Sequence, residues 1–435
     1  MHLKLSKSKN LKGQVTIPGD KSISHRSIIL SSLAEGTSEI SGFLKGEDCL
    51  ATLNSFKKMG VKIEEEDEKI SVHGVGLHGL KKPTENLYLG NSGTSMRLLA
   101  GLLSGQKFST ILTGDSSLSS RPMKRILEPL KEMGASITAS TNTAPLSIKP
   151  SNKLNGISYE LPIASAQVKS CILLAGLYAD SNTQVIESYL TRDHTEKMFK
   201  KFGIEIDENY KDSKKIIKIS PPRKLNPSTL NIPGDFSSAS FFIVAGLIIP
   251  NSEITLKNVG INSSRTALIK VLTQMGANIK IKNIKDDYEK TADIEIKTSN
   301  LKAIVLDEEL IPNLIDELPI LFIAASFARG KTIIRGVEEL RTKESDRLEA
   351  MSNSLRVLGV ESKSYSDGID ITGKSSLKSS VIIDSFGDHR IAMASSIACS
   401  MLDGENIIKN VENIQTSFPN FIETCGSLGI KAESF

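Results

Sequence analysis

One short pattern recurs six times along this chain of 435 residues. Each copy is an amphipathic, helix-like stretch that ends in a glycine and continues into a β-like stretch, as in KKMGVKI and KEMGASI. Successive glycines lie 69 to 83 residues apart, a spacing too regular for chance. Because glycine adopts a left-handed backbone conformation at little cost, each one is expected at the C′ position that ends a helix. These glycines are Gly60, Gly134, Gly203, Gly276, Gly359 and Gly429.

A second kind of helix-like segment precedes each amphipathic one and is apolar on nearly every face. Examples are LLAGLLSG and FFIVAGLIIP, in which small residues allow close packing. A helix without a polar face is expected to be buried on all sides. Six α/β units, each with one such helix, exceed what a single hydrophobic core holds. The sequence therefore predicts two domains of three units each.

The domain boundaries are indicated by the tetrapeptide IPGD, which occurs at residues 17–20 and again at 232–235. Both copies directly precede a buried helix. The sixth unit ends shortly after Gly429, so residues 1–19 are expected to supply its missing strands. We therefore expect one domain over residues 20–232 and a second formed by residues 1–19 and 233–435. The chain would cross twice, near residues 17–20 and 231–235, which predicts a hinge that closes over a ligand.

Charge and composition disfavour several classes of function. The formal net charge is +4 and no dense Lys/Arg tract appears, so nucleic acid is not an expected partner. The four cysteines lack CxxC spacing and the histidines form no ligand pair, so neither a disulfide nor a metal site is expected. The longest apolar run, FFIVAGLII, is too short to cross a bilayer, and the N-terminus lacks the apolar core of a signal peptide. A cytoplasmic protein without membrane association is expected.

The stretch GDKSISHR at residues 19–26 looks like half of a phosphate-binding loop. A P-loop requires a glycine directly before the lysine, but here Asp20 separates Gly19 from Lys21. The sequence therefore disfavours a P-loop NTPase, and the lysine needs another explanation.

Cations recur at the starts of the predicted helices. The N-terminus of a helix carries partial positive charge and favours acids or bound anions. A single long cation there can simply extend to solvent. Repetition in several units instead predicts a polyanionic ligand as counter-charge, because converging cations repel one another. The cations concerned are Lys21, Arg26, Arg97, Arg121, Lys124, Lys169, Arg192, Lys343, Arg347 and Arg390.

Small polar residues and acids accompany these cations. The turn GNSGTS at residues 90–95 would bring backbone N–H groups close to a ligand, and Ser165 and Gln167 could bind hydroxyl or phosphate groups. Acids among cations are candidates for proton transfer, which points to Asp316 and Glu344. Helix capping is the alternative for Ser165, Gln167 and Asp316, and a first-turn helix charge is the alternative for Glu344.

Lys343 and Arg347 are spaced i, i+4 around Glu344, which predicts that the two cations share one helix face.

Seven motifs occur in a fixed order: GDKSISHR, GNSGTSMR, RPM, SAQ, TRDHTEKM, KESDR and GDHR. With them the chain closely resembles the 5-enolpyruvylshikimate-3-phosphate synthase family over essentially its whole length, and it looks like the family's second, bacterial class. The resemblance implies an inverse α/β barrel fold of two domains, each with three βαβαββ-like repeats. It also implies a monomeric transferase without metal or organic cofactor. The enolpyruvyl group of phosphoenolpyruvate would pass to the 5-hydroxyl of shikimate 3-phosphate through a tetrahedral ketal, releasing phosphate.

The resemblance implies roles for individual residues. Lys21, Asp316 and Glu344 would carry the proton transfers. The residues that would contact shikimate 3-phosphate are Lys21, Ser22, Arg26, Ser165, Gln167, Arg192, Asp316 and Lys343. Those that would contact phosphoenolpyruvate are Lys21, Gly93, Arg121, Gln167, Arg347 and Arg390.

Two positions depart from the family pattern. Ala166 stands where some members have a second serine, so one phosphate contact is in question. Thr416, just before Ser417-Phe418-Pro419, stands where many members have a lysine that contacts phosphoenolpyruvate.

Two alternative functions stay open. The first is UDP-N-acetylglucosamine enolpyruvyl transferase, a related family that usually has asparagine where this chain has Ser22. The second is a non-catalytic anion-binding protein on the same scaffold, which an eroded set of acids and bases would favour.

Overall fold

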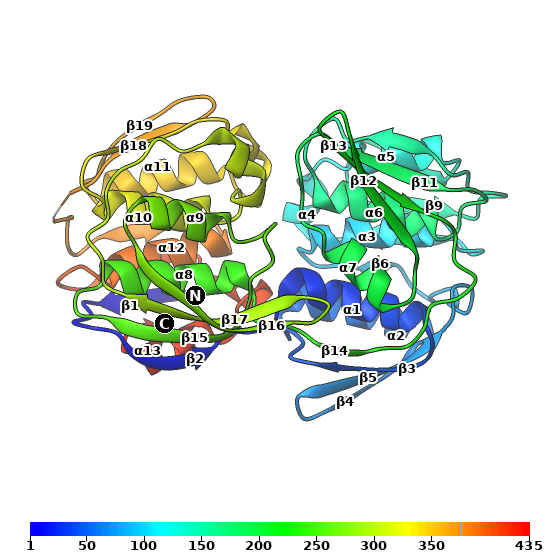
Figure 1. The fold of residues 1–435 in the computed structure, drawn as a ribbon, viewed down its shortest axis with the longest axis horizontal. Coiled ribbons are helices and arrows are strands. Elements are labelled where there is room, and N and C mark those ends of the chain that lie inside the picture. The colour runs from blue at the N-terminus through cyan, green and yellow to red at the C-terminus, as the bar shows by residue number, and fades with distance from the viewer. Residues whose placement is uncertain (375) are drawn as a thin grey trace. The chain divides into compact units, whose positions relative to one another are not determined.

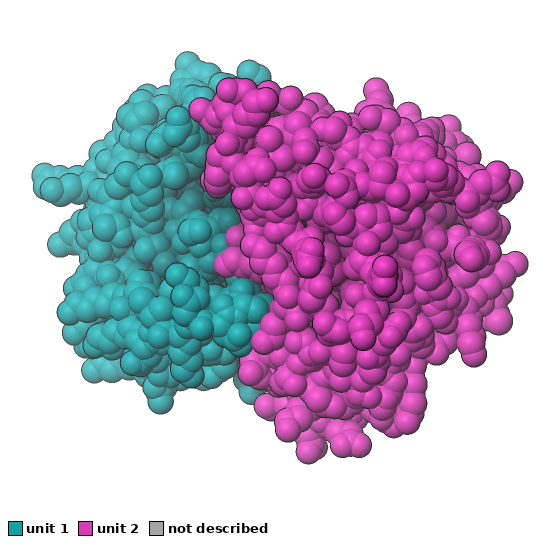
Figure 2. Space-filling view, turned by 45° about the vertical axis from the view of Figure 1, so that its right-hand side comes forward, with its two compact units in different colours: residues 1–18, 233–435 teal, residues 19–232 magenta. Residues whose placement is uncertain are grey.

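The computed structural model describes residues 1–374 and 376–435 as a mixed α/β protein of two compact units (Figures 1 and 2). Unit 1 comprises Met1–Pro18 and Pro233–Phe435, and unit 2 comprises Gly19–Ile232. The described strands form six small sheets, three in each unit.

The three sheets of unit 2 share one topology. In each, one edge strand runs parallel to its neighbour, and the remaining pairs are antiparallel. The edge strand β14 comes from the end of the unit and pairs with β3 near its start, which ties the two ends of the unit together. In order of neighbours, the sheets are β14 (Thr229–Asn231), β3 (Glu35–Ser41), β5 (Lys69–Val75) and β4 (Lys62–Glu66); β6 (Leu87–Tyr88), β7 (Thr110–Thr113), β9 (Leu146–Lys149) and β8 (Ser136–Thr138); and β10 (Ser158–Glu160), β11 (Thr183–Glu187), β13 (Lys214–Ile219) and β12 (Ile206–Lys211).

In unit 1 the N-terminal strands complete two sheets. Strand β1 lies between β22 and β23 and is antiparallel to both, and β2 pairs in parallel with β15. In the third sheet, parallel bridges from Lys302 and Val305 take the place of the parallel edge strand. In order of neighbours, the sheets are β2 (Lys12–Thr16), β15 (Glu253–Gly260), β17 (Lys290–Lys297) and β16 (Asn278–Asp286); β21 (Ile382–Asp384), β22 (Asn406–Lys409), β1 (His2–Ser6) and β23 (Lys431–Ser434); and β18 (Lys331–Ile334), β20 (Ile369–Thr372) and β19 (Glu361–Ser364).

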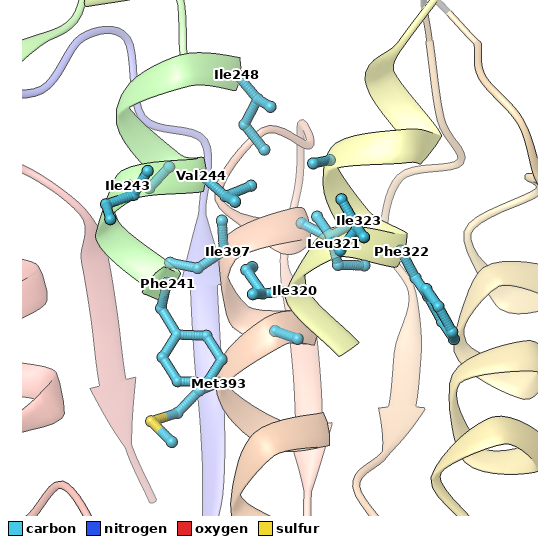
Figure 3. Close-up of a cluster of buried hydrophobic side chains, with 14 of the residues drawn as sticks. Phe241, Ile243, Val244, Ile248, Ile320, Leu321, Phe322, Ile323, Met393 and Ile397 are labelled. Atoms are coloured by element: carbon cyan, nitrogen blue, oxygen red, sulfur yellow. The ribbon is translucent and has the colours of Figure 1, made fainter. Parts of the chain in front are cut away.

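Each unit contains three buried helices, as their all-round apolar sequences predict. In unit 1 these are α8 (Phe236–Ile248), α10 (Leu318–Phe327) and α12 (His389–Cys399). Figure 3 shows their side chains packing together, with Phe241 and Val244 of α8 close to Ile320 of α10 and Ile397 of α12. In unit 2 they are α1 (Lys21–Leu33), α3 (Gly93–Leu103) and α6 (Ala166–Gly176).

The second helix of each repeat is amphipathic. In α9, for example, Leu268, Val271 and Leu272 are buried while Lys270 and Gln274 are exposed. These second helices are α2 (Glu47–Lys58), α5 (Lys124–Glu132), α7 (His194–Lys201), α9 (Ala267–Gln274), α11 (Arg347–Val357) and α13 (Phe421–Leu428). Shorter helices are α4 (Ser116–Ser120), η1 (Glu308–Asn313), η2 (Glu338–Thr342) and η3 (Glu412–Thr416). None of the described helices is long and apolar enough to cross a membrane.

Both copies of IPGD start a buried helix in the same way. Asp20 accepts a hydrogen bond from the Ile23 backbone N–H, and Asp235 accepts one from Ser237. A carboxylate at the N-cap satisfies one of the unpaired N–H groups of the first turn and complements the helix dipole. The preceding glycine allows close packing, because a Cβ atom on Gly19 would lie 1.8 Å from the carbonyl oxygen of Gly42.

The six recurring glycines confirm the sequence prediction. All of them have positive φ angles, between 75° and 94°. In every case the N–H of the next residue donates to the carbonyl five residues earlier, as from Val61 to Phe56 at 3.0 Å and from Ala277 to Leu272 at 2.9 Å. This is the Schellman arrangement, in which a left-handed residue satisfies the last carbonyls of a helix and turns the chain into the next strand.

The conformational role of these glycines predicts an effect on stability. A Cβ atom on Gly276 would meet nothing closer than 3.8 Å, so Gly276→Ala adds backbone strain without a clash. We expect a loss of about 1 kcal/mol in the free energy of unfolding, because a left-handed conformation disfavours a side chain. Gly426→Ala, inside α13 with no atom within 4 Å of the new Cβ, should be neutral or stabilising. Urea unfolding measures both, and equal midpoints for the two variants would contradict the assignment.

Candidate active site

The first candidate residues of unit 2 lie on α1. Lys21 is the first residue of this helix, and its Nζ lies 2.6 Å from Oδ2 of Asp48 in the first turn of α2. Lys21 and Ser22 are partly exposed, whereas the rest of α1 is buried. Lys21 is therefore held at the end of a buried helix as one half of an ion pair with a residue that the sequence analysis did not single out.

Arg26 is buried one turn further along α1 and is held by hydroxyl groups. Its Nε donates to Thr195 Oγ1 at 2.7 Å, and one terminal nitrogen donates to Ser170 Oγ at 2.6 Å. The other terminal nitrogen donates to the Ser22 carbonyl at 2.9 Å. Ser170 lies on α6, the helix that also carries Gln167. Thr195 lies on α7, which begins shortly after Arg192. Arg26 therefore links α1 to both of these helices. These neutral acceptors orient the guanidinium without cancelling its charge.

The starts of α3 and α6 are also linked by hydrogen bonds. Arg97 donates to Gln167 Oε1 at 2.9 Å, and the Gln167 amide donates to Thr94 Oγ1 at 3.0 Å. Ser165 is the N-cap of α6 and accepts a hydrogen bond from Val168 N–H. Ser165 therefore caps α6, a role that uses its side-chain oxygen as an acceptor. Arg97 was recognised in the sequence as a helix-start cation but received no role there.

Arg121 is the C-cap residue of α4, three residues before the first residue of α5, and it is bound to the turn before α3. Its guanidinium donates to the side chain of Asn91, to the Asn91 carbonyl at 3.3 Å and to Ser117 Oγ at 3.2 Å. A Cβ atom on Gly93 would lie 2.7 Å from a nitrogen of Arg97 and 3.3 Å from a nitrogen of Arg121. Glycine at this position thus lets both guanidinium groups lie against the start of α3.

In unit 1, Arg347 is surrounded by carboxylates. Its Nε donates to Asp388 Oδ2 at 2.8 Å, and its terminal nitrogens contact Glu344 at 2.5 Å and Asp316 at 3.3 Å. Burial would lower the pKa of Arg347, but the charges of Asp388, Glu344 and Asp316 raise it. Burial would likewise raise the pKa of Asp388, but the adjacent Arg347 holds it below the ordinary 3.8. Two of the three sequence-predicted acid–base residues therefore share one buried cation.

Arg390 brings a second guanidinium to the same acids. It donates to the Asp316 carbonyl at 2.9 Å, and its Nε lies 3.7 Å from the Asp316 carboxylate. Glu317, buried at the N-cap of α10, lies 3.9 Å from Arg390 and accepts a hydrogen bond from Ser237. The structure thus brings Asp316, Glu344, Arg347 and Arg390 together within unit 1.

Two expectations about the cations were wrong. Lys343 and Arg347 do not share a helix face, because α11 begins at Arg347, where Asp346 caps the helix by accepting from Glu349 N–H. Lys343 instead follows η2 and pairs with Glu339 at 2.6 Å. The same cap places Glu344 outside the first turn of α11.

Lys169 does not offer its charge to solvent at the start of α6. It is fully buried and paired with Glu187 at 3.1 Å and Glu196 at 2.6 Å. The acids that pair with Lys169 are distant from it in the sequence. The spacing of residues along the chain therefore does not reveal this pairing. One of the two positions that depart from the family pattern is held by a local contact. Thr416 is buried in η3 and donates its hydroxyl to the Asn413 carbonyl.

The candidate residues suit anionic ligands better than a metal ion. Among the described residues of either unit taken alone, no three His, Cys, Asp or Glu side chains bring their ligand atoms as close together as a metal site requires. The acids of unit 1 face guanidinium groups instead. Unit 2 contributes cations, amide groups and hydroxyls that can donate to phosphate or carboxylate oxygens.

Comparison with known proteins places these features in context. The family model "EPSP synthase (3-phosphoshikimate 1-carboxyvinyltransferase)" matches residues 5–425. A 3-phosphoshikimate 1-carboxyvinyltransferase from Legionella pneumophila is 50% identical over 429 residues, which cover 98% of this chain and 97% of that protein. A solved EPSP synthase from Acinetobacter baumannii has a TM-score of 0.88 and 46% identity, covering 99% of both chains. The enolpyruvyl transferase NikO from Streptomyces tendae, at 14% identity and a TM-score of 0.76 over 99% of this chain and 98% of that one, shares the fold.

The buried pair between Arg347 and Asp388 predicts a specific loss of stability. Asp388→Asn removes a fully buried charge from beside Arg347, and we expect a loss of about 3 kcal/mol in the free energy of unfolding at pH 7. Ser345→Ala, which removes only the hydroxyl that donates to Asp388 at 3.2 Å, should cost about 1 kcal/mol.

The same pair predicts a dependence on pH. Because the native pKa of Asp388 is depressed, its stabilising effect is present above the ordinary value of 3.8 and is lost as the pH falls through the lower native pKa. Urea unfolding between about pH 5 and pH 2 should therefore show a smaller acid-induced loss in Asp388→Asn than in the unaltered protein. Parallel pH profiles for the two proteins would refute a charged Asp388 in the folded state.

Proposed function

This chain belongs to the EPSP synthase (3-phosphoshikimate 1-carboxyvinyltransferase) family, and from that premise we propose which residues bind its two substrates and which move protons. The activity is that of the family, EC 2.5.1.19, a transferase reaction of the shikimate pathway to the aromatic amino acids. Shikimate 3-phosphate and phosphoenolpyruvate are the substrates. The observation that carries this conclusion is the match over nearly the full length of the chain at about half identity.

Shikimate 3-phosphate is assigned to a set of cations, hydroxyls and amide groups. Support comes from Arg26, whose guanidinium is oriented by Thr195 and Ser170, and from the partly exposed starts of α1 and α6. Charge-assisted hydrogen bonds of this kind contribute about 1.5–3 kcal/mol each. The assigned residues are Lys21, Ser22, Arg26, Ser165, Gln167 and Arg192 of unit 2, with Asp316 and Lys343 of unit 1.

Phosphoenolpyruvate, with its phosphate and carboxylate, is assigned to a set rich in arginine. Arginine presents N–H groups in a fork that matches both kinds of anion. Support comes from the contact of Arg121 with the turn that carries Gly93, and from the position of Arg390 beside Arg347 and its acids. The assigned residues are Lys21, Gly93, Arg121 and Gln167 of unit 2, with Arg347 and Arg390 of unit 1.

The proton transfers are assigned to Asp316, Glu344 and Lys21. The 5-hydroxyl oxygen adds to the enol carbon of phosphoenolpyruvate while its proton passes to Asp316, and the methylene carbon gains a proton from Glu344 or Lys21. The product of this step is a tetrahedral ketal phosphate. Phosphate then leaves, the methyl group returns a proton to the group that supplied one, and the double bond re-forms. Arg347, which contacts both Asp316 and Glu344, can stabilise negative charge that develops on the reacting groups.

Several finer features accompany this proposal. We assign the chain to the second, bacterial class of the family and its fold to the inverse α/β barrel arrangement of six repeats. Units 1 and 2 would act as the two domains, with residues 17–20 and 231–235 as the hinge. A monomeric state and a cytoplasmic location stay predictions.

The assay that tests the function follows release of inorganic phosphate. Purified protein with phosphoenolpyruvate and shikimate 3-phosphate should release phosphate at a rate proportional to enzyme. Replacement of shikimate 3-phosphate by UDP-N-acetylglucosamine should abolish the release. Release only with the nucleotide sugar would favour the related transferase, and no release from folded protein with either would favour a non-catalytic anion-binding role.

Replacement of Asp316 tests the assigned base. Asp316→Asn keeps the volume and removes the carboxylate, so we expect kcat to fall by roughly 10²–10⁴-fold, the usual contribution of a positioned general base. The matched control is Asp346→Asn, since asparagine also caps a helix and Asp346 lies outside the assigned site. Full activity in Asp316→Asn, with a thermal unfolding midpoint like that of the control, would remove Asp316 from the mechanism.

Replacement of Gly93 tests the phosphoenolpyruvate assignment. A methyl group at Gly93→Ala would press on the Arg97 and Arg121 guanidinium groups, which must shift. We expect KM for phosphoenolpyruvate to rise about tenfold or more, and KM for shikimate 3-phosphate to change less, because a misplaced guanidinium loses roughly one charge-assisted hydrogen bond. Gly426→Ala serves as a neutral glycine control. An equal rise in both KM values would argue against the assignment.

A further inference from the structure

A buried chain of side chains joins the first three helices of unit 2. His25, in α1, is completely buried, and its Nδ1 lies 2.7 Å from Thr52 Oγ1 in α2. Thr52 Oγ1 in turn lies 2.7 Å from Ser95 Oγ in α3, which lies 2.6 Å from Oγ of the N-cap Ser92. None of these four residues has a role in the reaction proposed above.

One direction of hydrogen bonding gives every hydroxyl in this chain an acceptor for its proton. Ser95 Oγ contacts the backbone carbonyl of Asp48 at 3.4 Å, and a carbonyl can only accept. In that direction Ser95 donates to the Asp48 carbonyl, Thr52 donates to Ser95, and His25 Nδ1–H donates to Thr52. Ser92 Oγ already accepts from the Ser95 N–H at 3.1 Å, which leaves its own proton for Ser95 Oγ.

His25 fits this chain only as the neutral tautomer with its proton on Nδ1. Its Nε2 is buried and has no hydrogen-bond partner among the described residues. A proton on Nε2 would be a buried donor without an acceptor, which is rarer and costlier than a bare acceptor. Burial, and then the charges of Lys21 and Arg26, lower the pKa of His25 well below 6.5, in agreement with a neutral ring.

The chain forms the inner of two cross-links between α1 and α2. The outer cross-link is the partly exposed ion pair of Lys21 with Asp48. The inner one joins His25 to Thr52, and each of its residues lies four positions, or one helical turn, after its counterpart in the outer pair. The inner cross-link is inaccessible to solvent, so it persists when a ligand competes with Asp48 for Lys21.

We propose that His25 is a positioning residue whose neutral Nδ1–H holds α1, α2 and the start of α3 in register, so that Lys21 and the turn carrying Gly93 stay aligned when substrate takes Lys21 from Asp48. The inference rests on the proposed assignment of Lys21 and Gly93 to substrate binding. His25 acts through Thr52 and Ser95 and does not touch substrate.

Two amide variants of His25 separate this role from simple packing. The Asn side chain places its amide nitrogen on Cγ, where Nδ1 stands in histidine, whereas the Gln side chain places it one atom further out, near Nε2. We expect His25→Asn to keep KM for phosphoenolpyruvate within about threefold of the unaltered enzyme, and His25→Gln to raise it about tenfold, with kcat changed less. Thr52→Ser and Thr52→Val should repeat this contrast from the other side of the bond.

Nitrogen-15 NMR of histidine-labelled protein tests the tautomer without reference to activity. The His25 signal, assigned by its absence from His25→Asn, should show a protonated Nδ1 and an unprotonated Nε2. A protonated Nε2 would overturn the proposal whatever the kinetic constants of the variants. Equal kinetic effects of Asn and Gln, or none from either in folded protein, would also overturn it.

Lys21→Met distinguishes this inference from the function on which it rests. If Lys21→Met keeps full activity, the substrate assignment fails whatever the His25 variants do. If Lys21→Met abolishes activity while His25→Gln leaves KM unchanged, only the positioning role of His25 is rejected.

Discussion

A helix that is apolar on nearly every face is stable only when it is covered on every side, and the described part of this chain has six of them. All thirteen residues of α8 are buried. In α1 and α6, only the first two residues are partly exposed. Most polar groups on such a helix that could contact a ligand therefore lie at or near its N-terminal end, where N–H groups are unpaired and anions are favoured. Lys21, Gln167 and Arg390 all stand at these ends.

The assigned arginines are prepared for their ligands in two different ways. Arg26 is oriented by hydroxyl groups and a carbonyl, which are neutral acceptors for its hydrogen bonds. Arg347 is instead enclosed by three carboxylates, and two of these are the assigned proton-transfer residues Asp316 and Glu344. The first arrangement suits the binding of a phosphate. The second suits acid–base chemistry, because the cation keeps acids close to one another that would otherwise repel.

Much of the local structure was predictable, because it depends on residues that are neighbours along the chain. The glycine prediction is confirmed at all six positions, since a left-handed residue after a helix has few alternatives to glycine. The prediction that Lys169 offers its charge to a ligand was wrong, because Glu187 and Glu196 reach it from other elements. The shared helix face of Lys343 and Arg347 was also wrong, because Asp346 caps the helix after Lys343. The assigned site residues stay predictions until they are tested.

The sequence by itself determined where helices end, which of them are buried and which chemical groups stand at their starts. These features depend on the periodicity of apolar residues and on the glycines that end helices, and both involve only residues close together along the chain. It also contained the motifs that identify the family. Only the tertiary structure decided which side chains meet. The pairing of Lys21 with Asp48, the pairing of Arg347 with Asp388 and the link from His25 through Thr52 to Ser95 join residues that are 27 to 43 positions apart in the sequence. Such contacts depend on how the apolar helices pack, and packing is a property of the whole core rather than of any one segment.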